Sequence, residues 1–433
     1  MKHRNSKNIS NLAKTFEKFS SNSEINESLP VDLQVESSSK FLSNMKITII
    51  GGGGIAATEL PKLSRELRRH GASTQFCITE NCLKFIGIDS LRWASGNEVI
   101  INPTGLAEHI CAADALVVCP ATADLISKSV NGICSDGATT LIQSALGLKK
   151  TIIFCATMHE SLTNSPIIKQ NREKLTKIPG VFFTTPRFEE GKEKLPSHQN
   201  LAIEIAHIIN KAALFNSNSQ NIIITAGGTR IMIDPVRCIT NLSTGSLGIE
   251  VAKVFYAMGI KTKLILGNTN FEVPEYQYQT IANLPEYEDM YNYVKNINEK
   301  DFDGIIHLVA GSDFICKNKF SEKISSTQEK VHLELNKTKK IIDLENISKI
   351  RFKAAAKLTS GKQEEGIKAA CEHMQIKQLN AILYSNIKDI WKNNNDHNAI
   401  FIENNDSILI KEPVSGKKDI ALKFFSSFIK FKG

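Results

Sequence analysis

The sequence has no pair of cysteines at a spacing typical of a disulfide framework or a zinc site. Its nine cysteines lie singly and form no CxxC motif, which indicates a reducing compartment. No apolar run approaches the ~18 residues needed to cross a bilayer. The first residues also lack the apolar segment of a secretory signal. These absences predict a cytoplasmic protein with no membrane partner.

The sequence also has few aromatic residues and only a mild excess of positive charge. Aromatic residues make up 7% of the 433 residues, and the formal net charge is +8. The basic residues are spread along the chain, whereas nucleic-acid binding usually requires a basic patch. We therefore expect small polyanionic ligands and no nucleic-acid partner. The hydrophobic content of 42% is ordinary for a globular protein, and the length suggests two or three domains.

Residues 1–44 are rich in Ser, Asn, Lys and Glu, which predicts a disordered or partly helical tail. From Met45, apolar runs alternate with amphipathic ones such as LPKLSRELRRHG, which has a stop glycine at Gly71. This alternation predicts a parallel, doubly wound α/β sheet. The strands predicted for this domain, residues 45–214, are 46–50, 73–78, 115–119 and 151–155.

A helix around residues 200–214 and the polar linker 215–220 separate a second α/β domain, 221–433. The strands predicted there are 221–225, 262–266, 304–310, 332–335, 381–385 and 399–403. The run ITAGGTRIMIDPVRCITNLSTGSLG, 224–248, is the most specific in the chain. An apolar strand leads into a turn at Gly227 and Gly228, and a second glycine-bearing loop opens a helix. Backbone N–H groups and the helix dipole make such a loop an anion site, to which Arg230 and Arg237 can add donors.

This run resembles the start of phosphopantothenate–cysteine ligase, the second half of the bifunctional coenzyme A biosynthesis family, whose pattern is ITAGPTREPIDPVRxISNxSSGxMG. The family's Pro is Gly228 here, and its Ser-Ser is Ser243-Thr244. Independently, 45–86 and CPATADLISKSVNGICSDGATTLIQSA resemble the flavoprotein decarboxylase half. The similarity extends from Met45 to Lys423 and keeps the order of the halves. It implies a flavodoxin-like FMN-binding domain followed by a Rossmann-like ligase domain, in a homo-oligomer.

The decarboxylase resemblance implies an FMN site at three strand ends, where a phosphate cradle and a flat pocket are needed. The implied FMN-binding residues are Gly53, Gly54, Ile55, Ala56, Thr79, Pro120, Ala121, Thr122 and Ala123. Three catalytic positions of the family are altered. The helical His of its GHIxL segment is Leu106, with His109 one turn along as a candidate substitute. Its carboxylate-binding Asn is His159, and the segment RFEEGKEKLPS contains no counterpart of its lid Cys. We expect lost or changed decarboxylation.

The ligase resemblance implies that CTP or another nucleotide, with Mg²⁺, activates 4′-phosphopantothenate for attack by cysteine. Its implied catalytic residues are Asn241, which binds the activated acyl group, and Lys323. The implied substrate- or nucleotide-binding residues are Gly227, Thr229, Arg230, Arg237, Asp313, Lys337, Phe352 and Lys377. Phe352 is a candidate nucleotide-stacking aromatic, and another pocket Lys of the family is His373 here. The sequence alone identifies no protein ligands for a metal.

Two other functions remain open from the sequence. One is a non-catalytic regulatory flavoprotein, since some eukaryotic relatives of the decarboxylase regulate phosphatases. The other is an FMN enzyme that acts on a different cysteine-containing substrate, which the altered lid and His159 would allow.

Overall fold

The computed structural model describes residues 30–432 except 106, 216–219, 275, 277–278, 393–396 and 406–407. It divides into two compact units, with the boundary between residues 217 and 218; residues 257–259 group with the N-terminal unit. Within the described residues, no helix is both long enough and apolar enough to cross a membrane.

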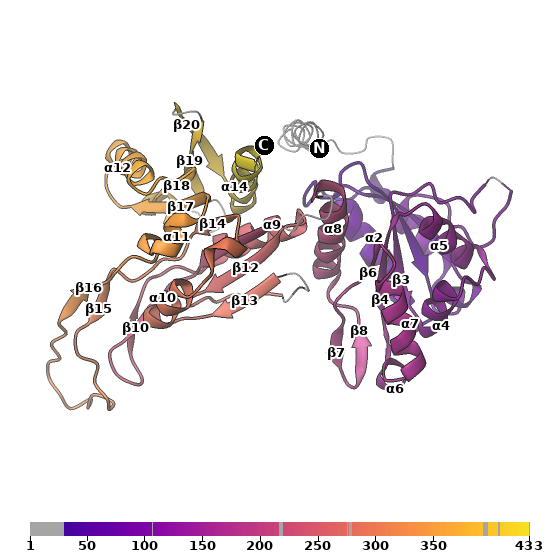
Figure 1. Ribbon diagram of the computed structural model, residues 1–433, viewed down its shortest axis with the longest axis horizontal. Helices are drawn as coiled ribbons and strands as arrows, with labels where there is room; N and C mark the ends of the chain where they lie inside the picture. The colour runs from indigo at the N-terminus through magenta and orange to yellow at the C-terminus, as the bar shows by residue number, and fades with distance from the viewer. Residues whose placement is uncertain are drawn as a thin grey trace. The chain divides into compact units, whose positions relative to one another are not determined.

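The N-terminal unit is built on a five-stranded parallel sheet in the order β2-β1-β3-β4-β6 (Figure 1). This is the flavodoxin-like order of a doubly wound sheet. The four predicted strands are confirmed, whereas β6 is too short to show an apolar pattern. The strands are β1 (Lys46–Gly51), β2 (Ser73–Ile78), β3 (Ala115–Ala121), β4 (Thr151–Ala156) and β6 (Val181–Phe183).

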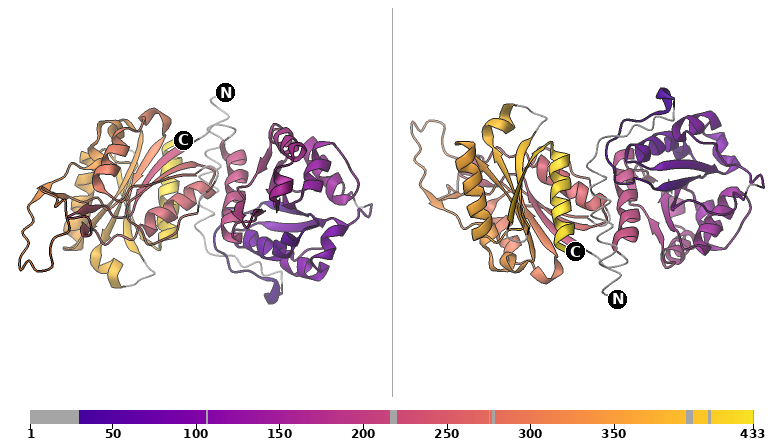
Figure 2. Two further views of the ribbon diagram at one scale, coloured as in Figure 1. Left: turned by 90° about the horizontal axis from the view of Figure 1, so that it is seen from below. Right: turned by 90° about the horizontal axis from the view of Figure 1, so that it is seen from above.

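Helices cover both faces of this sheet. Apolar side chains of α4, α5 and α7 share one buried cluster with alternate residues of the strands, while α2 and α8 pack together on the other face (Figures 1 and 2). The helices are η2 (Ile55–Glu59), α2 (Leu60–Arg69), η3 (Glu80–Lys84), α3 (Ile88–Ser95), α4 (Ala123–Val130), α5 (Gly137–Gly147), α6 (Glu160–Thr163), α7 (Pro166–Thr176) and α8 (His198–Phe215). A small antiparallel sheet joins β5 (Met158–His159), β8 (Lys192–Lys194) and β7 (Arg187–Glu189).

The predicted tail extends too far along the sequence. Residues 1–29 lie outside the described residues, but Phe41 and Leu42 are buried in the N-terminal unit. The Ser39 hydroxyl lies 2.6 Å from His70 Nδ1, and the Phe41 ring stacks on that imidazole. Residues 39–42 are therefore part of the folded unit, because two apolar side chains among polar neighbours were enough to anchor them.

The C-terminal unit contains an eight-stranded sheet in the order β13-β12-β9-β14-β17-β18-β19-β20. The first six strands are parallel and follow the Rossmann order, while β19 and β20 are antiparallel. The strands are β9 (Asn221–Ala226), β12 (Lys261–Leu266), β13 (Gln279–Asn283), β14 (Gly304–His307), β17 (Phe352–Thr359), β18 (Ala381–Asn386), β19 (Asn398–Asn405) and β20 (Ile408–Ser415).

Helices α12 and α14 lie on opposite faces of this sheet (Figure 2). Apolar residues of α12 pack on β17, β18 and β19, whereas phenylalanines of α14 pack on α9, β17 and β19. The helices are α9 (Ser246–Ala257), α10 (Tyr287–Lys295), η4 (Glu299–Asp301), η5 (Ile341–Asp343), α11 (Glu345–Lys349), α12 (Gln363–Ile376), α13 (Ile387–Lys392) and α14 (Lys417–Lys432).

One strand prediction in this unit is wrong and one central strand was missed. Residues 332–334 are not in a strand. Only β16 (Leu335–Lys337) forms, and it pairs with β15 (Phe314–Cys316) in a separate two-stranded ribbon. The loop between them extends away from the main sheet (Figure 1). The missed strand is β17, whose sequence FKAAAKLT has no β-branched residue before its final Thr, so its composition does not resemble a buried strand.

Candidate functional site

In the N-terminal unit, a glycine-bearing loop after β1 packs against the segments that follow β2 and β3. A Cβ atom on Gly52 would lie 2.4 Å from the Pro120 carbonyl oxygen, and one on Gly53 would lie 2.5 Å from Asn81 Cβ. Any larger residue would push these segments apart. The three strand ends that the sequence selected therefore meet at the carboxyl edge of the sheet, where doubly wound sheets bind ligands.

Backbone donors are available at this edge. Gly54 is the N-cap of η2, so the first N–H groups of that helix, beginning with Ile55 and Ala56, have no acceptor within it. Thr79 is buried, and its hydroxyl and N–H both donate to the Gly51 carbonyl, at 3.2 and 3.0 Å. Thr79 therefore joins the ends of β1 and β2, and only the lone pairs of its hydroxyl remain for a ligand.

The segment after β3 is shaped by the start of α4. The Thr122 hydroxyl accepts a hydrogen bond from the Leu125 N–H at 3.3 Å and so caps this helix. Ala121 is buried at the end of β3, and Ala123 is the first residue of α4. These small side chains leave a smooth wall beside the glycine loop, as a flat ring would require.

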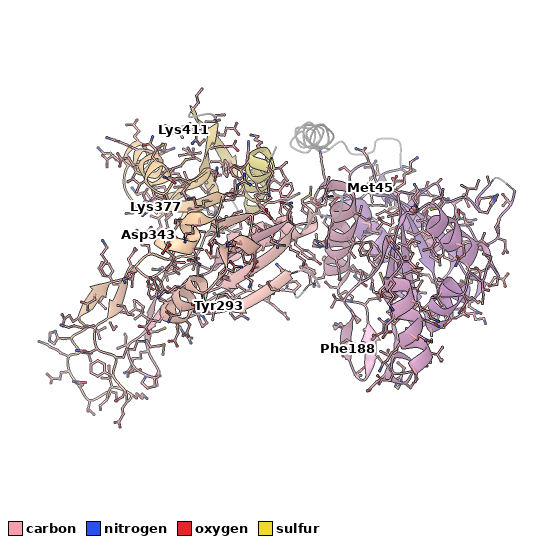
Figure 3. The ribbon with its side chains drawn as sticks, in the orientation of Figure 1. Met45, Phe188, Tyr293, Asp343, Lys377 and Lys411 are labelled. Atoms are coloured by element: carbon pink, nitrogen blue, oxygen red, sulfur yellow. The ribbon has the colours of Figure 1, made fainter. Side chains whose placement is uncertain are left out.

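The altered decarboxylase position His159 lies beside the segment that resembles the family's lid. His159 is exposed at the end of β5, and its Nδ1 accepts from the Ser161 N–H at 3.2 Å. It is paired in register with Lys192 of β8. The lid-like segment is thus a hairpin of β7 and β8, which includes Phe188 (Figure 3). Its side chains bring charge, but no thiol, near His159.

The helix predicted around His109 is wrong. His109 is exposed in a turn in which the Ile110 N–H donates to the Ala107 carbonyl at 2.9 Å, and no helix includes residues 107–114. Leu106 lies outside the described residues. His109 therefore does not lie one helical turn from residue 106, because residues 107–114 form a turn and not a helix.

In the C-terminal unit, close glycine packing joins β9, β12 and α9. Gly227 has φ +83°, and a Cβ there would lie 2.6 Å from the Asn268 carbonyl oxygen. A Cβ on Gly248 would lie 2.3 Å from Ala226 Cβ, so the start of α9 rests directly on the end of β9. This is the role of the glycines in dinucleotide-binding folds, which present a helix N-terminus to an anion.

Asn241 and Thr229 are both bonded to the segment after β14. The Asn241 amide nitrogen donates to the Ala310 and Gly311 carbonyls at 2.9 and 3.2 Å. The Thr229 hydroxyl accepts from the Ser312 N–H at 2.8 Å. As a result, the Asn241 side chain has its amide hydrogens occupied and offers its oxygen to a ligand.

Asp313, Lys337 and Lys377 are linked through their neighbours. The Thr338 N–H donates to the Asp313 carbonyl at 2.9 Å, next to Lys337. The Lys377 ammonium lies 2.6 Å from an oxygen of Asp343 (Figure 3). Lys337 and Asp343 line a pocket of about 270 Å³ that is rich in lysine. Its lining residues are Tyr291, Lys337, Thr338, Lys339, Lys340 and Asp343.

Asp234, which was not among the predicted site residues, joins Arg237 to Ile324, the residue that follows Lys323. Asp234 is 1% exposed and accepts from the N–H groups of Val236, Arg237 and Ile324 at 2.8, 2.7 and 3.1 Å. Its carboxylate also accepts from the Arg237 guanidinium at 2.6 Å. Burial raises the pKa of Asp234, but these hydrogen bonds and the guanidinium outweigh it and lower the pKa below its usual value. Its place in the DPVR motif could have signalled this role.

Two predicted ligand contacts are not supported by the geometry. Phe352 is fully buried at the start of β17, and its ring packs edge-on against Phe428 of α14 at 5.2 Å. It is a core residue and cannot stack on a nucleotide, so that prediction is wrong. Arg230 points its guanidinium toward Glu286, 3.8 Å away, which competes with a phosphate for the same donors.

Two histidines also lie at this edge. His307 is the last residue of β14. Burial lowers its pKa to about 4; His373 and Lys340 act in the same direction, and Asp343 acts against them. His373, on α12, has a pKa lowered by burial and by lysines 357, 340 and 377. His373 was named from the sequence, whereas His307 was not, because it lies inside an apolar strand. In the described part of the chain, no three His, Cys, Asp or Glu side chains are grouped to hold a metal ion.

Comparison with known sequences identifies both halves. Residues 217–431 match the family described as the DNA/pantothenate metabolism flavoprotein C-terminal domain, and residues 35–210 match the flavoprotein family. The coenzyme A biosynthesis bifunctional protein CoaBC of Thermococcus kodakarensis is 34% identical over 379 residues, 84% of this chain and 91% of the relative. The chain belongs to the CoaBC family. The resemblance found in the sequence is therefore confirmed.

A second CoaBC protein, from Methanocaldococcus jannaschii, is 34% identical over 368 residues, which cover 83% of this chain and 87% of the relative. Among solved structures, the DNA/pantothenate metabolism flavoprotein from Streptococcus pneumoniae matches 50% of this chain and all of its own, with 23% identity and a TM-score of 0.43. The FMN-dependent cysteine decarboxylase SpaF matches 37% of this chain and 95% of its own, with 19% identity and a TM-score of 0.34.

Proposed function

We propose that the C-terminal unit joins cysteine to 4′-phosphopantothenate at the expense of CTP, with Mg²⁺ bound to the nucleotide. The observation that supports this most is that Asn241, Thr229, Asp313, Lys337 and Lys377 are linked by contacts around one edge of the sheet. These residues come from five separate segments of the sequence. Nothing in the packing of the core requires exposed lysines to gather there, whereas a polyanionic substrate does.

The reaction has two steps. The carboxylate of 4′-phosphopantothenate attacks the α-phosphorus of CTP, which forms an acyl-cytidylate and releases pyrophosphate. The amine of cysteine then attacks the acyl carbon, the amide forms, and CMP leaves. Lysine ammonium groups around the pocket would neutralise the phosphates. The Asn241 oxygen would accept a hydrogen bond from the attacking amine, while its amide group holds the loop in place.

We also propose that the N-terminal unit binds FMN, with its phosphate on the amides at the start of η2 and its ring beside Ala121 and Thr122. The absence of room for a Cβ at Gly52 and Gly53 supports this, because it lets the ends of β1, β2 and β3 meet at the edge where the cradle would lie. Bound flavin would supply the oxidation of a substrate. In line with the resemblance, we propose that the chain forms a homo-oligomer, which sedimentation of the purified protein would test.

The ligase proposal is tested by quenched-flow product analysis with phosphopantothenate, CTP, Mg²⁺ and cysteine. Asn241→Ala should slow amide formation roughly tenfold to a hundredfold, because the attacking amine loses its acceptor, and should accumulate acyl-cytidylate. Lys323→Ala should instead produce little acyl-cytidylate, because a point charge to phosphate is lost. Lys330→Ala, an exposed lysine in the same loop, is the matched control. Turnover like that of the wild type in both site variants would refute the assignment.

A second function of the N-terminal unit is favoured by His159 and the hairpin without a thiol. Changes at three positions that are catalytic in the family should leave little decarboxylation of 4′-phosphopantothenoylcysteine. This unit would then act on another cysteine-containing substrate or regulate another protein. Carbon dioxide release near ~10 s⁻¹, a typical enzyme rate, would contradict this. If His109→Ala abolished that rate, His109 would be the substitute. A flavin-bound protein that releases no pyrophosphate with any nucleotide would favour the regulatory function.

A further inference from the structure

His307 lies at the topological switch point of the C-terminal sheet. It is the last residue of β14, and in the parallel register it is paired with Thr225 of β9. From β9 the sheet proceeds to β12 and β13 on one side, and from β14 to β17 and β18 on the other. In open α/β sheets, ligands bind outside the carboxyl ends of the strands at this place.

The hydrogen bonds of Thr225 determine which nitrogen of His307 carries the proton. Thr225 is fully buried. Its hydroxyl oxygen accepts from the Val309 N–H at 3.3 Å and lies 3.0 Å from His307 Nδ1. A buried hydroxyl hydrogen needs an acceptor, and within the described residues this nitrogen is the acceptor in reach. Thr225 therefore donates to Nδ1, and the ring keeps its hydrogen on Nε2.

The surroundings favour the uncharged ring. His373 of α12 and Lys340, which precedes η5, oppose a positive charge on His307, and Asp343 of η5 favours one. Lys377, the residue that follows α12, neutralises much of that carboxylate, since its ammonium lies 2.6 Å from an Asp343 oxygen. Burial is the largest influence and acts in the same direction as the cations, so the pKa falls to about 4. At neutral pH the ring is an uncharged donor beside a group of lysines.

We propose that His307 holds the nucleoside part of the nucleotide by donating its Nε2 hydrogen to an uncharged acceptor, a base carbonyl, a ring nitrogen or a ribose oxygen. This rests on the proposed ligase function. The lysines around the pocket serve the phosphates, which are better ligands for ammonium groups than for a neutral imidazole. A neutral imidazole with its hydrogen fixed on Nε2 instead selects a ligand that has an acceptor at this point. A ligand with a donor there would place two hydrogens against each other and lose the hydrogen bond.

Calorimetric titration of the full chain tests this with three probes: CTP, cytidine and inorganic tripolyphosphate. His307→Ala should weaken the binding of CTP and cytidine roughly tenfold and leave tripolyphosphate binding unchanged. His307→Gln, whose amide can donate, should recover part of the loss. His332→Ala, which removes an exposed histidine of the loop between β15 and β16, is the control and should bind all three probes like the wild type.

Three results would overturn the proposal. Unchanged CTP binding in His307→Ala would show that the ring makes no contact. An equal loss for tripolyphosphate would place its effect on the phosphates or on the fold. A histidine nitrogen NMR spectrum with the hydrogen on Nδ1 would remove the tautomer argument even if a variant failed to fold. The ligase function itself fails if the wild type binds tripolyphosphate but no nucleotide and forms no amide. A wild type that forms the amide, together with a His307→Ala variant that binds CTP normally, would overturn only the role of His307.

Discussion

Glu204 is a carboxyl group buried in α8, where water cannot solvate its charge. It is 1% exposed, and one of its oxygens accepts from the N–H and hydroxyl of Thr185 at 2.9 and 3.0 Å. Burial raises its pKa to about 7, and the bonds from Thr185 offset only part of this. The folded chain therefore binds a proton that the unfolded chain releases between the ordinary carboxyl pKa and about pH 7.

Stability should accordingly fall as the pH rises through this window, because the folded state binds more protons there. Glu204→Gln keeps an acceptor for Thr185 without the charge. We expect it to stabilise the N-terminal unit by up to about 3 kcal/mol at pH 8 and to have no such effect at pH 4. Thermal unfolding at both pH values measures this, with the exposed Glu173→Gln as control. Equal stability of Glu204→Gln and the wild type at pH 8 would be the contrary result.

Asp234 should position Lys323 without touching substrate. Asp234→Asn keeps the shape of the side chain but loses the charge that holds Arg237 and replaces an acceptor by a donor near the Ile324 N–H. We expect the loop between β15 and β16 to be cleaved roughly tenfold faster by protease and nucleotide use to fall, while flavin binding is unchanged. Limited proteolysis followed by mass spectrometry locates the cut. Cleavage elsewhere, with this loop intact, would contradict the role.

At the scale of elements, α9 depends on one glycine. Its first turn rests on the end of β9, since a Cβ on Gly248 would lie 2.3 Å from Ala226 Cβ. Gly248→Ala should therefore overpack this contact and destabilise the C-terminal unit by about 1–3 kcal/mol, although alanine favours helix. Denaturant unfolding measures it. Gly147→Ala is the matched control, because a Cβ at the end of α5 meets nothing within 4 Å; a similar loss there would implicate something other than overpacking.

For the whole molecule, the two proposed ligands should act on different units. A ligand that binds only the folded state adds about 2.7 kcal/mol at a hundredfold excess over its dissociation constant. In calorimetry of the full chain, FMN should raise the unfolding temperature of one transition and CTP with Mg²⁺ that of another. Each transition is assigned by variants, with Glu204→Gln for the N-terminal unit and Gly248→Ala for the C-terminal unit. A single transition shifted by both ligands would refute independent binding.

The sequence determined the strands whose own composition is distinctive. The runs at 46–50 and 221–225 are rich in β-branched residues and end at glycines, so local preference and the parallel sheet agree. The run at 332–335 shows the limit of this argument, because it alternates like a strand but lies beside no buried surface. In β17 the opposite holds: alanines have weak strand preference, yet the strand forms because β14 and β18 flank it.

The candidate site divides in the same way. The motif 224–248 indicated the anion loop, since glycine and helix-start signals are local properties of the chain. Only the tertiary structure showed that Phe352 is a core residue, that Asp234 joins two distant segments, and that the Thr225 hydroxyl lies within hydrogen-bond distance of His307 Nδ1. These depend on pairs of residues about 80 or more positions apart in the chain, and a hydrogen bond or a buried contact between such residues exists only when folding brings them together.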